Sequence, residues 1–263
     1  MVTQIRRTAL RFNWLGFATV IGILAIWQIV VDTKILNYSA LPSPTEIITG
    51  LRYIAGNGMW SELWHTVSCV LIAWAIAVLL GGTVGLLVSL NATVASWSSA
   101  TVDVFRSLPV IALIPIAILI WGTGSKAEII LGAYAGIWPM LINTAGGVRN
   151  LPPRLIDVAR SLRLSRLATL VKIVIPSTGG AMLVGARLSL ATSLVICVVA
   201  EILGLQSGLG NALSLEQAGD QPARMWAYVL IVGTLGLLVN LGLVRLVRVA
   251  FPGVAASSER SAS

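Results

Sequence analysis

RNLPPRLIDVARSLRLSR, at residues 149–166, is the segment that decides what kind of chain this is. It lies between two long apolar runs and continues to Ile173-Val174-Ile175-Pro176. Six basic residues fall between Arg149 and Lys172, against the single acid Asp157. A charged and structured loop between apolar runs indicates a membrane protein that binds a partner on the side where this loop lies.

Composition places the rest of the chain in the membrane. Apolar residues make up 57% of it and charged residues 11%, with a mean hydropathy of +0.90, whereas a soluble domain carries about 25% charged residues. We therefore expect an all-α, multi-span membrane protein with one domain over residues 1–263. The net charge of +8 does not indicate nucleic-acid binding, because the basic residues lie in loops between apolar runs.

Six apolar runs are each long enough for a helix of about 20 residues that crosses a bilayer. They lie near residues 14–31, 66–90, 100–121, 127–148, 178–204 and 225–249. The first has no small-residue cleavage site after it, so we expect a retained anchor and not a cleaved signal peptide. The tail at residues 255–263 is small and polar, and we expect it to be disordered.

The distribution of basic residues predicts the orientation. With the N-terminus inside, thirteen of the 18 basic residues lie on the inner side, with Arg106 counted among them, and four lie on the outer side. This bias predicts cytoplasmic N- and C-termini and a cytoplasmic loop at residues 149–176.

The loop itself predicts two helices joined by a tight turn. Pro152-Pro153 suits the first turn of a helix, and Leu155, Ile156, Ala159 and Leu162 recur at helical spacing as one apolar stripe. Ser165 is the expected N-cap of the second helix. The alternative is an ordinary positive-inside loop without a partner, but a topology signal alone needs no amphipathic helix.

Two outer segments carry structural signals of their own. Leu41-Pro42-Ser43-Pro44 is expected to be extended, with Ser43 or Thr45 capping a short helix that starts near Glu46. Ser207, Gly208 and Gly210 precede another short helical pattern within residues 205–224. This pattern predicts a re-entrant or surface helix entered through a glycine turn.

Ionisable residues and prolines inside the runs need an explanation. Arg187 is interpreted as a structural charge paired with Asp103 or with helix carbonyls, and the alternative is that it attracts an anionic substrate. Glu201 is expected to hold the turn at Ser207–Gly210 through its backbone N–H groups. Prolines at 109, 115 and 139 should break or kink spans, either to line a pathway or to fix a bend needed for packing.

Catalytic and metal chemistry have little support in the sequence. Cys69 and Cys197 fall inside apolar runs, which predicts buried thiols and not a disulfide. His65 is the single histidine and no Cys/His cluster is visible, so we expect no metal site and no catalytic residue. No Gly-x-x-x-x-Gly-Lys-[Ser/Thr] segment is present, so we expect no ATP hydrolysis by the chain itself.

With these features in place, the loop resembles the EAA motif of ABC-importer permeases: Glu-Ala-Ala, three residues, glycine, nine residues, Ile-x-Leu-Pro. Asp157-Val158-Ala159 occupies the triplet, Arg163 the glycine position and Ile173–Pro176 the end. Further segments are similar to the branch that imports nitrate, sulfonates, taurine, bicarbonate or thiamine precursors. These are Leu41–Pro44, Phe105–Pro109, Val199–Gly204 and Ser207–Gly210.

The resemblance implies a type I importer permease fold, with six transmembrane helices and a cytoplasmic coupling helix, in the bacterial inner membrane. The implied partners are a second permease subunit in a homodimer, two cytoplasmic ATPase subunits and an extracytoplasmic binding protein that delivers a small, anionic solute. ATP and Mg²⁺ would bind the ATPases, which leaves no cofactor in this chain. The implied docking helix comprises Arg154, Asp157, Val158, Ala159, Arg160, Leu162 and Arg163. On it, a small residue at Ala159 would seat the helix and Asp157 would pair with a basic group of the partner.

At Arg163 the chain departs from the family glycine. We expect a right-handed residue that continues the helix, because Leu162 and Leu164 leave no other helix breaker before Ser165. The alternative is a left-handed residue whose strain is accepted because its guanidinium contacts the ATPase.

Two other classes of function are weighed against an ATP-driven permease. A secondary transporter or channel would work without ATP, but no inverted repeat and no intramembrane carboxylate chain is visible. A membrane-embedded enzyme is disfavoured by the single histidine and the few polar groups inside the runs. Co-purification with an ATPase subunit would discriminate among the three.

Overall fold

The computed structural model describes residues 14–34 and 40–250, and every regular element in that part of the chain is a helix. The all-α prediction is therefore confirmed. The tail at residues 255–263, for which we predicted disorder, lies outside the described residues.

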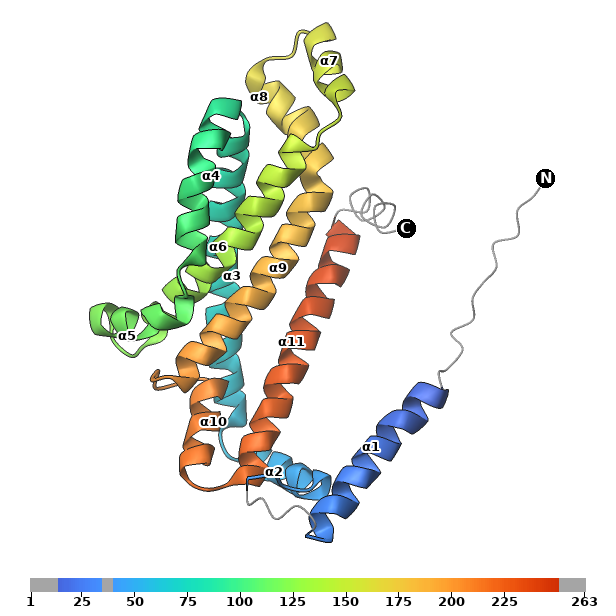
Figure 1. Cartoon of the computed structure of the whole chain (residues 1–263), viewed down its shortest axis with the longest axis vertical. Helices are drawn as coiled ribbons and strands as arrows, with labels where there is room; N and C mark the ends of the chain where they lie inside the picture. Colours follow the sequence, from blue (N-terminus) through green and yellow to red (C-terminus); the bar gives the residue numbers. More distant parts are fainter. Residues whose placement is uncertain (1–13, 35–39, 251–263) are drawn as a thin grey trace, which may run out of the picture.

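Three long helices form the centre of the molecule: α3 (Met59–Ser89), α6 (Ser125–Arg149) and α9 (Ile175–Ile202). They pack side by side, with α6 in contact with both others (Figure 1). Glycines permit this close approach, since a Cβ at Gly81 of α3 would lie 2.6 Å from the backbone oxygen of Ile137 in α6. Small residues at such contacts let helix backbones pack closely inside a membrane.

The third apolar run is broken and does not form one straight helix. Its halves, α4 (Ala92–Ser107) and α5 (Val110–Trp121), meet at an angle of 77°. Pro109 restrains Leu108 to an extended backbone with ψ of 125°, which ends α4 and confirms the predicted break. Pro115 and Pro139 lie inside α5 and α6 without ending them. In the described residues, five helices are long and apolar enough to cross a membrane, and the bent pair makes six when it is counted as one span.

The other two long helices lie outside this centre, and α11 (Pro222–Ala250) packs on α9. α11 contacts α2 (Pro44–Gly56) and α10 (Leu209–Ala218), and α10 also packs on α9. α1 (Trp14–Asp32) touches α2 and buries none of its own residues. Ser43 caps α2, as predicted, in a reciprocal capping box with Glu46.

The short elements of the basic loop are α7 (Pro153–Ser161), α8 (Arg166–Thr169) and the π-helical η1 (Leu170–Val174). Figure 1 shows α7 and α8 at one end of the bundle and α2 and α10 at the other. α11 runs from the α2 end toward the α7 end, and α1 runs in the opposite direction. Both described ends of the chain therefore face the α7 side.

Candidate functional site

The basic loop folds into the predicted helix, tight turn and helix. α7 begins with Pro153 in its first turn, where the missing N–H costs nothing. α8 follows with Ser165 as its N-cap, whose hydroxyl accepts a hydrogen bond of 3.2 Å from the N–H of Ala168. Both caps were predicted from local sequence and both are confirmed.

The turn between α7 and α8 corrects our expectation for Arg163. Its φ is +48°, so the residue is left-handed and does not continue the helix. The N–H of Leu164 donates to the carbonyl of Ala159, and that of Arg163 to the carbonyl of Arg160, each at 3.0 Å. These two bonds form the Schellman motif, which satisfies the last carbonyls of a helix and needs a left-handed residue at this position. The backbone requirement of the turn outweighs the cost of placing a side chain there.

α7 has one face on its own chain and one face free. Ala159 is only 3% exposed, and Leu155 and Ile156 are half-buried. Leu162 was predicted to share this stripe, but it is 64% exposed because it lies at the C-cap, beyond the last turn of the helix. Ala159 therefore seats α7 against its own chain and does not lie at the surface where the sequence analysis placed it.

The free face of α7 carries the other residues expected at a docking site. Val158 is 49% exposed, and the charged members are exposed as well: Arg154, Asp157, Arg160 and Arg163. Asp157 pairs with Arg160 at 3.6 Å, one helical turn away. A pair this exposed contributes about 0–1 kcal/mol, so its charges stay available to a partner.

A continuous helical rod leads from this loop through the bundle. α8, η1 and α9 form one uninterrupted span over Arg166–Ile202, 37 residues long. The π turn directly precedes Pro176, and the N–H of Ile175 donates to the carbonyl of Leu170, five residues earlier. π turns accommodate a local disruption of helical hydrogen bonding, here beside a proline that cannot donate. The rod connects the basic loop to the opposite end of the molecule.

At that opposite end, Glu201 holds the glycine turn. Its Oε2 accepts a 2.8 Å hydrogen bond from the backbone N–H of Gly210, as the sequence predicted. Its Oε1 accepts a 2.7 Å hydrogen bond from the hydroxyl of Thr66 on α3, and the oxygen of that hydroxyl accepts from the N–H of Leu209. Glu201 and Thr66 are fully buried, so this network is completed within the chain.

Gly208 is the residue on which this turn depends. Its φ is +102°, and a Cβ there would overlap the carboxylate of Glu201. Its N–H donates to a carboxylate oxygen of Glu62 on α3. Ser207 precedes it and is partly buried. Only glycine satisfies both the backbone conformation and the space at this position.

The sequence analysis missed the residues of α3 that complete this end. Glu62, His65, Thr66 and Cys69 recur at helical spacing and form a polar stripe on a helix that is otherwise apolar. This stripe is a signal that the sequence contains. The partners could not be inferred, because Thr66 and Glu201 are separated by 135 residues.

Arg187 bonds a residue other than those we expected. Its Nε donates a 2.7 Å hydrogen bond to Oδ1 of Asn240 on α11. Asp103, which we considered as its partner, pairs with Arg106 at 2.8 Å. Arg187 is exposed on the surface of the described chain, between α9 and α11. The bond to Asn240 is consistent with a structural role.

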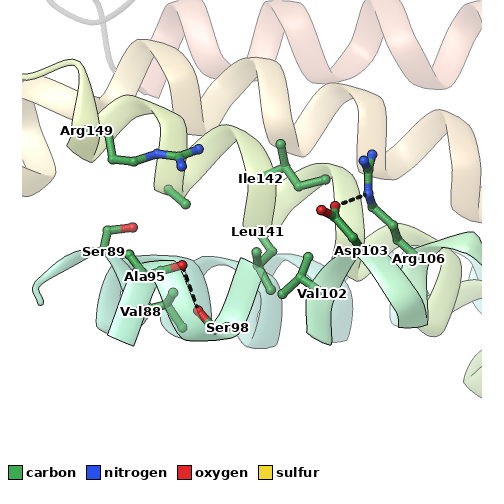
Figure 2. Close-up of a pocket in the computed structure, with 11 residues that line it drawn as sticks. Val88, Ser89, Ala95, Ser98, Val102, Asp103, Arg106, Leu141, Ile142 and Arg149 are labelled. Atoms are coloured by element: carbon green, nitrogen blue, oxygen red, sulfur yellow. Dashed lines mark hydrogen bonds and ion pairs between the residues drawn. The ribbon is translucent and has the colours of Figure 1, made fainter. Parts of the chain in front are cut away.

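Two hollows lie beside Arg106. One, of about 220 Å³, is bounded by α3, α4 and α6, and Figure 2 shows Arg149 at one of its ends and the Arg106–Asp103 pair at the other. The second is an open groove of about 530 Å³ along α5, α6 and α9, with Trp138 and Thr192 among its lining. Arg106 lies beside the middle of α6 in both, so its place among the inner loops in our count was wrong.

The class of protein follows from these features together with a family comparison. The described residues form a bundle of helices long and apolar enough to cross a membrane, with an exposed helical loop at one end. A family model described as the binding-protein-dependent transport system inner membrane component matches residues 77–255. The chain belongs to this family, and it is thus the permease subunit of an ABC importer and not its ATPase.

Curated relatives agree with the branch that the sequence resembles. The chain is 28% identical to the putative aliphatic sulfonates transport permease protein SsuC of Bacillus subtilis, over 88% of this chain and 84% of that one. It is 30% identical to the bicarbonate transport system permease protein CmpB of Synechococcus elongatus, with coverages of 86% and 85%. The taurine transport system permease protein TauC of Escherichia coli is 26% identical, with coverages of 87% and 86%.

Solved structures share the fold. A chain of the MetNI methionine ABC transporter in an inward-facing conformation matches with a TM-score of 0.65 at 21% identity, and the match covers 73% of this chain and 97% of that one. A chain of an amino acid ABC transporter matches with a TM-score of 0.60 at 16% identity, with coverages of 81% and 98%. The importer-permease fold that we expected is confirmed.

Proposed function

We propose that two copies of this chain form the membrane pathway of an ATP-driven importer for a small anion. In this proposal two cytoplasmic ATPase subunits bind α7, and an external binding protein delivers substrate at the α2 and α10 end. The observation that carries the proposal is the free face of α7 at the end of the 37-residue rod.

The free face of α7 has the composition of a docking surface. Leu162 and Val158 expose apolar area beside exposed charges of both signs. An apolar centre ringed by charge is the usual arrangement of a binding patch. Because Ala159 is buried against its own chain, a partner that moves this face of α7 would also move η1, on which α7 packs.

The rod explains how movement at α7 could reach the other end. A helix of 37 residues is about 55 Å long at 1.5 Å per residue. Glu201 near its far end bonds Gly210 and Thr66, so displacement of the rod pulls on the turn and on α3. Packed helices move between discrete arrangements and do not deform gradually. ATP binding and hydrolysis in the partner subunits would supply the alternation.

Exposed apolar side chains support the second permease copy. α1 buries none of its residues, and Leu119 of α5 is 86% exposed. A second copy and lipid would share these surfaces in the assembled transporter. The orientation that we propose places α7 and both chain ends in the cytoplasm, because most basic residues lie on that side.

The groove along α5, α6 and α9 is our candidate for the pathway. It is largely apolar, and Arg106 is the one cationic residue that lines it in the described part of the chain. Because Arg106 also pairs with Asp103, its charge would attract an anion without holding it tightly. The names of the relatives, which mention sulfonates, bicarbonate and taurine, agree with a small charged solute.

Co-purification tests the docking part of this proposal. The permease is co-expressed with the candidate ATPase subunit, and Leu162→Asp is compared with Leu215→Asp, whose side chain is 65% exposed at the far end on α10. We expect Leu162→Asp to lose the ATPase and Leu215→Asp to retain it, at equal permease yield. Equal retention of the ATPase by both variants would remove α7 from the docking role.

Uptake measurements test the pathway part. Arg106→Gln should lower uptake of the anionic substrate about 10-fold or more, through loss of one favourable charge interaction, while ATPase co-purification is unchanged. Arg187→Gln serves as the comparison, because Arg187 bonds Asn240 away from the groove. If only Arg187→Gln lowers uptake at normal yield, the anion follows the surface between α9 and α11 instead.

A further inference from the structure

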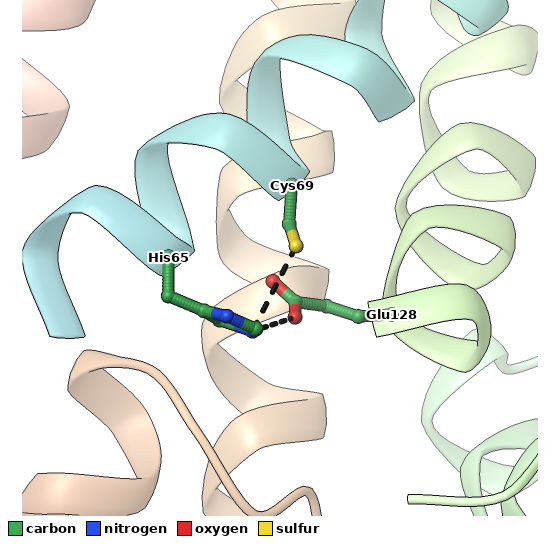
Figure 3. A group of neighbouring side chains, drawn as sticks. All are labelled: His65, Cys69 and Glu128. Carbon is green, nitrogen blue, oxygen red and sulfur yellow. Dashed lines mark hydrogen bonds and ion pairs between the residues drawn. The ribbon is translucent and has the colours of Figure 1, made fainter. Parts of the chain in front are cut away.

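Three side chains of the kind that bind metals meet between α3 and α6. His65 and Cys69 lie one helical turn apart on α3, and Glu128 projects toward them from the first turn of α6 (Figure 3). The ligand atoms of the three side chains all lie within 4.8 Å of one another. Nitrogen, sulfur and carboxylate oxygen are the three ligand types that Zn²⁺ accepts.

The spacings within this group match those of ligands around one ion. Nε2 of His65 lies 3.1 Å from Oε2 of Glu128 and 3.8 Å from Sγ of Cys69. Two ligands on a tetrahedral zinc ion, with bonds of about 2.0–2.3 Å, are separated by about 3.3–3.6 Å. A small adjustment of side chains would therefore suffice to bring all three onto one ion.

The carboxylate of Glu128 is the independent sign that something else belongs here. Its side chain is fully buried, and its Oε1 has no hydrogen-bond partner among the residues that the structure describes. Neither lysine nor arginine is paired with it in that part of the chain, and the polar groups beside it are His65, the thiol of Cys69 and the carboxyl group of Glu201. A buried carboxylate oxygen without a partner is unusual in a native protein. A cation placed between these side chains would satisfy it.

We propose that His65, Cys69 and Glu128 form a binding site for a divalent transition metal ion of the zinc type, with the fourth position open to water. Binding would displace the thiol proton of Cys69 to solvent. The proton shared by Nε2 of His65 and Oε2 of Glu128 would move to Nδ1 of His65 or to solvent, so that both atoms bind the ion. Mg²⁺ and Ca²⁺ do not fit, because they prefer six or more oxygen ligands. The proposal departs from our sequence-based expectation that the chain has no metal site.

Such a site would act on the outer turn. Thr66, which bonds Glu201 and Leu209, lies between His65 and Cys69 on the same turn of α3. A metal ion joining α3 to α6 would fix the segment that carries Thr66. His65 retains 25% of its side-chain exposure and is the point from which an ion can enter. The site is separate from the α7 surface and does not depend on it.

Metal titration of the full-length permease tests this. The purified chain in detergent is treated with a chelator, dialysed, and titrated with Zn²⁺ against a chromophoric competitor, and with Co²⁺ to follow the absorption band of a cobalt–thiolate bond. We expect one ion per chain together with that band. Cys69→Ser should abolish the band and weaken Zn²⁺ binding at least 10-fold. Glu128→Gln should weaken Zn²⁺ binding by at least the same factor.

Cys197→Ser is the matched control, because Cys197 is the other buried thiol and lies outside the group of ligand atoms. It should keep both the band and the affinity. Size-exclusion profiles establish whether each variant is folded. If Cys69→Ser does not fold, the Zn²⁺ affinity of the near-isosteric Glu128→Gln decides the test. Zn²⁺ binding by the wild type no stronger than by Cys69→Ser, or a thiolate band lost only in Cys197→Ser, would overturn the proposal. Either result would leave His65 and Glu128 as a hydrogen-bonded pair alone.

Discussion

The two ends of the helical rod over Arg166–Ile202 are built in opposite ways. At the loop end, backbone hydrogen bonds shape α7 and its turn, while most of the charged side chains remain exposed. At the opposite end, the side chains of Glu201 and Thr66 are fully buried and bond one another and the glycine turn. One end is completed by side-chain contacts within the chain, and the other keeps its charged side chains exposed.

This difference predicts where substitutions act. Changes at the outer turn should lower the stability of the permease itself, because buried polar groups would lose partners. Changes on the free face of α7 should leave the isolated permease intact and act only when a partner is present. The predictions below test that division, from the largest expected effect to the smallest.

Gly208→Ala should have the largest effect. The new Cβ would overlap the carboxylate of Glu201 and would occupy a backbone with φ of +102°. Strain and overlap together should cost about 3–5 kcal/mol of unfolding free energy, seen as a lower thermal midpoint in detergent. Gly146→Ala is the control, since nothing lies within 4 Å of a Cβ in that helix, and it should be neutral or slightly stabilising. Equal stability of the two variants would show that the turn is not rigid.

Glu201→Ala should cause the second-largest loss of unfolding free energy. The N–H of Gly210 and the hydroxyl of Thr66 would lose their acceptor in a buried environment, at about 2–4 kcal/mol in total. Glu201→Gln keeps one carboxamide oxygen and should cost less. The control is Glu216→Ala, whose 3.7 Å ion pair with Arg224 is partly exposed and should contribute no more than about 1 kcal/mol. A thermal midpoint for Glu201→Ala as high as that of Glu216→Ala would contradict the proposed network.

Ala159→Trp tests the other end. Ala159 is buried against its own chain, so the indole should displace α7 at a local cost of about 1–3 kcal/mol. Trypsin should then cleave the loop faster at its arginines, with membrane insertion preserved. Val158 is the half-exposed neighbour. Trypsin should cleave the Val158→Trp variant at the wild-type rate, while this substitution weakens ATPase binding. If both variants cleave at the same rate, α7 is not seated through Ala159.

Local sequence signals predicted most of the helices and their caps. They did not predict which residues distant in the sequence would contact one another. Pro153, Ser165 and Ser43 begin helices where the sequence places them, because capping involves neighbours within three residues. The break at Pro109 was also predictable, but the 77° angle was not, since packing of α5 against α6 and α9 accompanies it.

The candidate sites show the same division. The contact of Glu201 with its turn spans nine residues and was anticipated, whereas its bond to Thr66 spans 135. His65, Cys69 and Glu128 likewise meet only because α3 and α6 pack together. The prediction of a right-handed backbone at Arg163 was wrong for a different reason. Helix propensity favoured continuation of the helix, whereas the Schellman turn required a left-handed residue.

Arg163→Gly is the smallest change that we predict, and it has the opposite sign. Arginine at φ of +48° costs about 1 kcal/mol relative to glycine, which adopts this conformation without strain. Arg163→Gly should therefore slow tryptic cleavage at the other loop arginines and raise the stability of the loop by about that amount. Asp220→Gly is the comparison, since Asp220 is also left-handed, at φ of +53°, after α10. Its gain should be smaller, because aspartate tolerates this region better than arginine.

The two backbone hydrogen bonds of the turn offset the strain at Arg163 and leave its side chain free to serve another purpose. The guanidinium of Arg163 is exposed, and none of the hydrogen bonds or ion pairs found in the described residues involves it. We propose that an acidic group on the ATPase subunit of the proposed importer binds this exposed guanidinium. Arg163→Ala should then weaken ATPase co-purification, and Arg163→Gly should weaken it equally while it stabilises the isolated loop. If Arg163→Gly binds the ATPase as well as wild type does, the guanidinium takes no part in docking.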